Sequence, residues 1–222
     1  MTSFPRHAGL VPCFVLATLT TAAGAQQVFD VSVNTESLLG QHGALDFNFD
    51  RGPQPAQLAT LAIGNFSTNG SFAGGCPCSI GAVTGQAPST VTFQNLSGLN
   101  DYFEAFTFGS QLKFTLTLDG PAVQSPNGSA SGSTLAFSLF TDPSGATPAL
   151  TADANGFAFL LDLNGDASTT LENFSPQTTV SPAQVSVPTV SEPNLYLLML
   201  TGLAITGAAA RRRPDGRAPR LP

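Results

Sequence analysis

The stretch Leu112-Lys-Phe-Thr-Leu-Thr-Leu118 decides the fold class, because every second residue is apolar and the residues between them are lysine or threonine. Side chains of a β-strand point alternately to the two faces of a sheet. This spacing therefore predicts a strand with one face buried and the other in water. The same two-residue period recurs in four further segments, at 28–33, 45–49, 135–139 and 157–163.

Weaker strands are predicted in five other segments, at 58–66, 90–96, 102–108, 170–174 and 183–187. Glycine, proline, serine, threonine and asparagine separate the ten segments, and no helical pattern precedes Leu195. Many short strands at close spacing are typical of an antiparallel β-sandwich or jelly roll, and we expect an all-β domain of one of these kinds. Fifteen of the seventeen phenylalanines lie in these segments and their loops, and we interpret them as core packing rather than a ligand-stacking surface.

The N-terminus has the pattern of a secretory signal peptide. A short basic start with Arg6 precedes the apolar stretch 8–19, and the small residues Ala23 and Ala25 come before Gln26. Small side chains at these two positions fit the pockets of signal peptidase. We therefore expect cleavage before Gln26 and export of the rest of the chain.

The C-terminus combines three parts in a fixed order: Ser191-Glu-Pro193, an apolar run at 195–210, and Arg211-Arg-Arg213. At ~1.5 Å per residue the apolar run gives roughly 24 Å of helix, which long basic side chains can extend toward a hydrocarbon core of about 30 Å. Arginine clusters stay on the cytoplasmic side of a membrane. The pattern therefore predicts a transmembrane helix with the large middle of the chain outside the cell membrane.

This tripartite tail resembles the PEP-CTERM sorting signal of Gram-negative bacteria. The resemblance rests on Glu192, Pro193, the leucine-rich helix and the arginine cluster, while Ser191 replaces the first proline of the motif. It implies that an exosortase reads Glu192 and Pro193, cuts the chain near them, and releases the protein or attaches it at the cell surface. A plain single-pass anchor is the alternative.

The stretches 30–35, 44–49, 100–109 and 131–138 are also similar to the ectodomains of a group of PEP-CTERM proteins, a likeness that strengthens the sorting prediction without supplying a role. The predicted organisation is as follows: signal peptide 1–25, β-sandwich ectodomain 26–175, edge strand or linker 176–190, sorting signal 191–213 with its helix at 195–210, and cytoplasmic tail 214–222.

Charge excludes one class of partner. Between Gln26 and Val190 the chain has twelve acidic residues and two basic ones, Arg51 and Lys113, which gives this part a net charge of −10. Such a domain repels phosphate backbones, so we expect no binding to nucleic acid. A cationic partner or a divalent cation is electrostatically allowed.

Residues for catalysis are scarce, and we expect no enzyme. Outside the signal peptide the one histidine is His42, which we interpret as a turn residue. No G-x-S-x-G, H-E-x-x-H or phosphate-binding loop occurs. Asp101 and Glu104 are the nearest candidates for the paired carboxylates of a glycosidase, although a turn entering a strand explains them equally well.

Two short motifs have alternative interpretations. Asp162, Asn164 and Asp166 place oxygen ligands at alternate positions, as a calcium loop begins, but Ala167 stands where that loop needs glycine. Asn164-Gly165 between two predicted strands favours a hairpin instead. Cys76 and Cys78 lie in one loop, and in an oxidising compartment we expect a local disulfide, with an interchain bond or a soft metal as alternatives.

These observations favour a noncatalytic surface or extracellular-matrix protein with a structural or adhesive role in an exopolysaccharide layer. Its expected partners are signal peptidase, exosortase, the membrane through 195–210, and exopolysaccharide. The alternative is a calcium-assisted binding module, and an extracellular hydrolase is the third possibility. Sugar stacking on aromatic rings is disfavoured, because the chain has no tryptophan and the ectodomain has Tyr102 as its one tyrosine.

Overall fold

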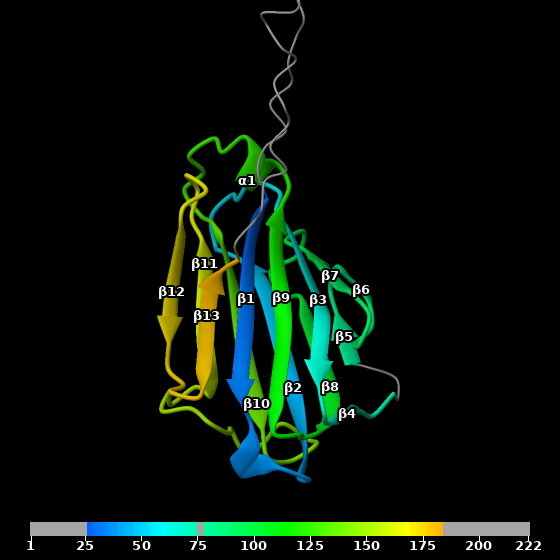
Figure 1. Cartoon of the computed structure of the whole chain (residues 1–222). Coiled ribbons are helices and arrows are strands. Elements are labelled where there is room, and N and C mark those ends of the chain that lie inside the picture. Colours follow the sequence, from blue (N-terminus) through cyan, green and yellow to red (C-terminus); the bar gives the residue numbers. More distant parts are fainter. Residues whose placement is uncertain (1–25, 75–77, 184–222) are drawn as a thin grey trace, which may run out of the picture. The chain divides into compact units, whose positions relative to one another are not determined.

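The computed structural model describes residues 26–74 and 78–183, which form two antiparallel β-sheets (Figure 1). The strands are β1 (Gln27–Asn34), β2 (His42–Arg51), β3 (Thr60–Thr68), β4 (Ser71–Phe72), β5 (Cys78–Ile80), β6 (Val83–Gly85), β7 (Val91–Gln94), β8 (Asp101–Thr107), β9 (Gln111–Asp119), β10 (Ser133–Phe140), β11 (Phe157–Leu163), β12 (Thr169–Asn173) and β13 (Thr178–Pro182). Two short helices accompany them, η1 (Glu36–Leu38) and α1 (Pro121–Gln124).

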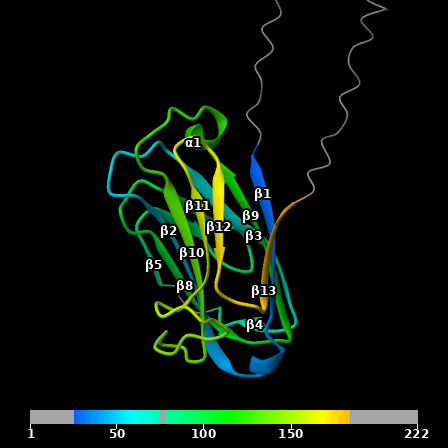
Figure 2. The same ribbon diagram turned by 90° about the vertical axis from the view of Figure 1, so that its left-hand side faces the viewer.

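The two sheets lie as two layers, with β12 and β13 at the same side of the domain (Figure 2). Sheet A has the order β13-β1-β9-β3-β7-β6, and sheet B has the order β12-β11-β10-β2-β8-β4, with β5 also pairing with β8. The expectation of an all-β antiparallel domain is confirmed for the described residues, and the arrangement is consistent with a β-sandwich.

The strand that decided the fold class lies in the middle of sheet A, between β1 and β3. In β9, Leu112, Phe114, Leu116 and Leu118 are buried, as their two-residue period predicts. Lys113 is exposed on the outer face of the sheet.

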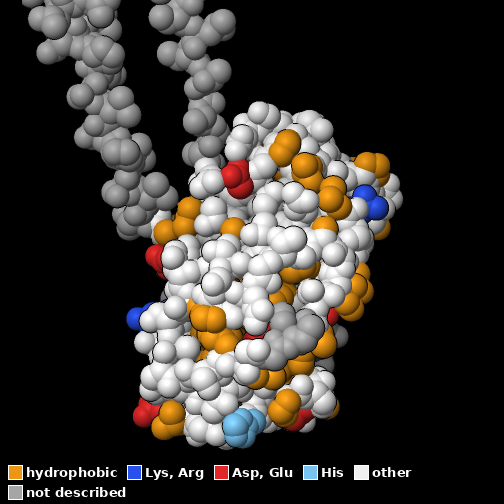
Figure 3. Space-filling model, turned by 90° about the vertical axis from the view of Figure 1, so that its right-hand side faces the viewer, with side chains coloured by type: hydrophobic (Ala, Val, Ile, Leu, Met, Phe, Trp, Pro, Cys, Tyr) orange, Lys and Arg blue, Asp and Glu red, His pale blue; other side chains and the backbone are white. Residues whose placement is uncertain are grey.

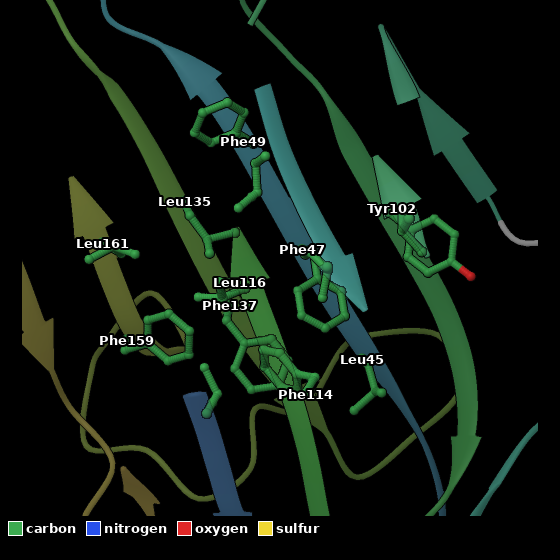
Figure 4. Close-up of a cluster of buried hydrophobic side chains, with 14 of the residues drawn as sticks. Leu45, Phe47, Phe49, Tyr102, Phe114, Leu116, Leu135, Phe137, Phe159 and Leu161 are labelled. Atoms are coloured by element: carbon green, nitrogen blue, oxygen red, sulfur yellow. The ribbon is translucent and has the colours of Figure 1, made fainter. Parts of the chain in front are cut away.

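The core joins the two sheets through phenylalanine rings (Figure 4). Phe47 of sheet B contacts Phe114 of sheet A with ring centroids 5.4 Å apart and the planes at 83°, an edge-to-face arrangement. The ring centroid of Phe137 lies 4.8 Å from that of Phe47 and 5.2 Å from that of Phe114. The interpretation of phenylalanine as packing is confirmed for these residues. Phe103 and Phe140 are exceptions, because they lie half-buried on the outer face of sheet B.

One strand breaks its alternation, and the break matters for the surface. In β3, Leu61 and Ile63 point inward, but the register against β9 shifts between Gly64 and Ser67. Asn65, with φ at 53°, is the extra residue of this β-bulge. The shift exposes Asn65 and turns Phe66 toward the core. The ring centroids of Phe66 and Phe114 are 5.8 Å apart.

The elements that sequence periodicity missed are short. Strands β4, β5 and β6 have two or three residues each, and α1 is a single turn. Alternation cannot be recognised over so few positions. A strand also forms at β13, before the predicted segment 183–187, of which all but Ala183 lie outside the described residues.

The first and last strands of the domain are neighbours. Strand β13 pairs antiparallel with β1, and the Ala183 amide donates a hydrogen bond of 2.8 Å to the Val28 carbonyl. Both ends of the described domain, Gln26 and Ala183, therefore lie at the same end of sheet A.

Candidate functional site

The two carboxylates that sequence singled out do not meet. Asp101 and Glu104 are three residues apart on β8, so they point to opposite faces of sheet B. Glu104 is buried inside the domain, where its Oε2 accepts a hydrogen bond of 2.8 Å from the Tyr102 hydroxyl. That hydroxyl in turn accepts one of 2.9 Å from the Ala87 amide. Tyr102 is therefore a core residue with satisfied hydrogen bonds and presents no ring to a sugar.

Asp101 instead faces Asp46 of β2 on the outer face of sheet B. Asn48 of β2 lies directly opposite Asp101 of β8. Asp46, two residues before Asn48 and on the same face, is therefore the diagonal neighbour of Asp101. The two carboxyl groups are in hydrogen-bonding contact. In each of them Oδ1 is buried and receives no hydrogen bond from any donor in the described part of the chain.

The surroundings of this carboxyl pair, Asp46 and Asp101, disfavour two negative charges. Burial raises the pKa of Asp46 to about 8, and the contact with Asp101 adds to the shift. Burial also raises the pKa of Asp50, the next acidic side chain on the same face of β2, although the Asn100 amide donates a bond of 2.6 Å to its Oδ1. Sequence reasoning missed Asp46, although the alternation Asp46-Phe-Asn48-Phe-Asp50 already placed three polar groups on one face.

The carboxyl pair does not have the geometry of a glycosidase. Those enzymes hold two carboxyl groups about 5 to 10 Å apart, with a sugar or a water between them. Direct contact between Asp46 and Asp101 leaves no such space. Among the residues in 26–74 and 78–183, no group of three or more histidine, cysteine, aspartate and glutamate side chains is placed to hold a metal ion.

The calcium candidates belong to the hairpin between β11 and β12. Asp162 Oδ1 accepts a bond of 2.5 Å from the Thr134 hydroxyl, and Asp166 Oδ1 accepts bonds from the Ser168 amide and hydroxyl at 2.9 and 2.6 Å. The Asn164 amide group donates to the Ser168 hydroxyl. The predicted hairpin is present, but its left-handed residue is Ala167, with φ at 65°, rather than Asn164 or Gly165.

A second candidate is an open groove of about 410 Å³ on the outer face of sheet A, which we call the sheet A groove. It crosses β13, β1, β9 and β3 and includes the bulge residue Asn65. Its polar lining consists of Asp30, Ser32, Asn65, Ser67, Lys113, Thr115, Thr179 and Ser181. Its volume is in the range of small-ligand sites, roughly 300 to 1,000 Å³, and bulges often lie next to functional sites.

The groove offers many hydrogen-bonding groups and both signs of charge. The Thr115 hydroxyl donates to Asp30 Oδ1 at 3.3 Å, and the Gln111 amide group donates to the Ser32 hydroxyl at 3.2 Å. Val31 and Phe114 of its lining are buried. A hydroxyl can both donate and accept, so such a lining suits an uncharged ligand rich in hydroxyl groups.

The remaining sequence candidates have simpler positions. His42 begins β2 rather than lying in the turn, and its exposed ring nitrogen Nδ1 is 2.9 Å from the Thr107 hydroxyl. Cys78 is exposed on β5, while Cys76 lies outside the described residues, so the disulfide stays a prediction. The same holds for the signal peptidase site at Ala23 and Ala25.

The predicted sorting signal also lies outside the described residues, with Ser191, Glu192, Pro193, Arg211, Arg212 and Arg213. Within 26–74 and 78–183 no helix is long and apolar enough to cross a membrane.

Comparison with protein-family models, with curated proteins and with solved structures gives no match. The fold class of the described residues rests on the sheet topology alone, which defines an all-β domain of two antiparallel sheets. Its surface carries sparse, scattered charged side chains on the face shown in Figure 3.

Proposed function

We propose that this chain is an exported, noncatalytic surface or matrix protein, sorted by an exosortase, whose sheet A groove binds a hydroxyl-rich polymer of an exopolysaccharide layer. The observation that carries the binding proposal is the lining of the groove, which combines short hydroxyl and amide side chains with one carboxylate and one ammonium. The signal peptide 1–25 and the tail 191–213 with its apolar helix support export and sorting.

A polysaccharide fits the groove because of spacing as well as chemistry. Neighbouring strands lie ~4.8 Å apart, so outward polar side chains repeat at that interval across the sheet. Ser181 of β13, Asp30 of β1 and Thr115 of β9 follow one another across the groove in this way. An open groove of this kind lets a long polymer pass over the sheet, whereas a closed cavity would admit only its end.

The charge of the domain favours a neutral polymer over an acidic one. Twelve acidic residues against two basic ones repel a polyuronate at long range, and screening by salt weakens this repulsion. Within the groove, Lys113 can donate hydrogen bonds to the hydroxyl oxygens of a sugar, and Asp30 can accept hydrogen bonds from sugar hydroxyls.

The test is binding of the full-length chain to immobilised neutral and acidic polysaccharides. We expect retention on a neutral polymer, and a loss of roughly five-fold in affinity for Thr115→Val, because one hydrogen bond contributes about 1 kcal/mol. Valine keeps the shape and strand preference of threonine, so the change removes the hydroxyl alone.

Thr117→Val is the matched control. Thr117 lies two residues further on β9, on the same face of sheet A but outside the groove. It should bind like the unmodified chain. Equal weakening by both variants would contradict the groove as the site, and no retention of the unmodified chain on any polysaccharide would reject the binding proposal.

A further inference from the structure

We infer that Asp46 and Asp101 share one proton between β2 and β8, and that this carboxyl pair is a pH-sensitive clasp for the edge of sheet B formed by β8 and β5. The inference is independent of polysaccharide binding, because the pair lies on the other sheet.

Asp46 and Asp101 lie on the same face of the neighbouring strands β2 and β8. Both carboxyl groups have a buried Oδ1 without a donor, and they touch each other. Two carboxylate anions at such a distance repel strongly, whereas one carboxylic acid donates a hydrogen bond to one carboxylate. A shared proton therefore supplies a hydrogen-bond donor within a pair whose buried Oδ1 atoms receive none from the described residues.

No basic side chain of the described residues lies beside the carboxyl pair to neutralise it in place of a proton. Asp50 and Asn48 of β2 and Ser138 of β10 face the pair. Cys78 of β5 lies beside it, because Cys78 pairs with Phe103, which in turn pairs with Asp46. The nearby Asn48 side chain favours the Asp46 anion, but Asp50 adds a further negative charge.

The basic groups of the described domain lie elsewhere. Arg51 is exposed at the end of β2, Lys113 belongs to sheet A, and His42 lies at the start of β2 beside Thr107. None of them faces the carboxyl pair, so a proton is the cation that is left to neutralise it.

The carboxyl pair lies close to one edge of sheet B. Among the described residues, the sheet continues beyond β8 only as β4 and β5, with two and three residues. Strand β8 is therefore held mainly by its pairing with β2, which runs from His42 to Asn48. Loss of the shared proton puts two negative charges across that pairing and weakens the attachment of β8 and β5.

The direction of the effect follows from proton linkage. The pKa of Asp46 is raised to about 8 in the folded chain, from an ordinary value of 3.8. Between these values the folded state binds a proton that the unfolded state does not. The stability from this proton is present in full below the unfolded pKa and is lost as the pH rises through the folded one.

The direct test is a carbon-13 NMR titration of the aspartate carboxyl groups in the labelled full-length chain. We expect the pair to titrate in two separate steps, the later of them well above the ordinary range of aspartate. Ionisation of both groups below about pH 5 would overturn the inference, whatever any variant does.

A second measurement follows unfolding of the full-length chain between about pH 5 and pH 9. It is made in a background with Cys76→Ser and Cys78→Ser, so that no thiol group of the ectodomain contributes to the pH dependence. We expect the melting temperature of the unmodified chain to fall with rising pH. Asp46→Asn should reduce that fall to less than half, because the amide group of the new asparagine donates to Asp101 at every pH.

Asp162→Asn is the matched control, since Asp162 is another outward aspartate of sheet B that bonds to a neighbouring strand. It should keep the full pH dependence. If the melting temperature of Asp46→Asn falls with pH as steeply as that of the unmodified chain, the clasp does not exist.

Discussion

At the scale of single residues, the buried bond between Tyr102 and Glu104 shows how an acidic side chain is accommodated inside an apolar core. Glu104 is 2% exposed and Tyr102 is fully buried. The phenol donates to the carboxylate and accepts from the Ala87 amide, so one hydroxyl satisfies two buried groups. Burial raises the pKa of Tyr102, and the bond to Glu104 adds to this shift, which keeps the phenol protonated as a donor.

We predict that Tyr102→Phe destabilises the domain by about 1 to 3 kcal/mol, because it leaves a buried acceptor and a buried amide without their partner. Equilibrium unfolding in urea measures the effect. A double-mutant cycle with Glu104→Leu, which removes the acceptor, isolates the bond, and a coupling below about 0.5 kcal/mol would contradict this assignment.

At the scale of elements, the bulge in β3 connects backbone strain with the surface of sheet A. Asn65 adopts a left-handed conformation, which asparagine tolerates better than most residues and β-branched residues tolerate poorly. Its exposure in the sheet A groove and the inward turn of Phe66 are consequences of the same register shift.

We predict that Asn65→Val costs roughly 1 to 2 kcal/mol of unfolding free energy, because a β-branched side chain at positive φ is strained. Asn65→Gly should change stability by less than about 0.5 kcal/mol, since glycine adopts this conformation freely. Thermal and urea unfolding of the two variants give the comparison. Equal losses would show that the side chain of Asn65, rather than its backbone conformation, stabilises the bulge.

At the scale of the whole molecule, the ends of the described domain determine how it can be tethered. Gln26 precedes β1 and Ala183 follows the adjacent strand β13, so the proposed signal peptide and sorting tail join the domain at one end of sheet A. Helix η1 follows the far end of β1 and lies at the other end of the domain.

For the mature protein from its native host, we predict an N-terminus at Gln26 and a C-terminus that lacks Arg211 to Arg213, as intact mass spectrometry would show. Glu192→Ala should leave the uncut form in the membrane fraction, whereas Asn164→Ala, in the hairpin of the ectodomain, should not. Intact arginines on most molecules would defeat sorting and leave a plain membrane anchor.

Sequence alone determined the strands with a long two-residue period, because burial of one face of a sheet forces that pattern on residues 112–118 of β9 and 45–49 of β2. It also determined the acidic balance and the strand-turn-strand character of 157–174, although the turn uses Ala167 as its left-handed residue. Short elements such as β5 and α1 have too few positions to show any period.

Only the tertiary structure decided which acidic residues meet. Asp101 and Glu104 are neighbours in sequence but lie on opposite faces, while Asp46 and Asp101 are 55 positions apart by their residue numbers and in contact. The physical reason is strand register. Alternation fixes the face on which a side chain lies, but the pairing of β2 with β8 fixes its neighbour on that face, and no local pattern encodes that pairing. The sheet A groove depends on register in the same way, because it forms where four strands and one bulge come together.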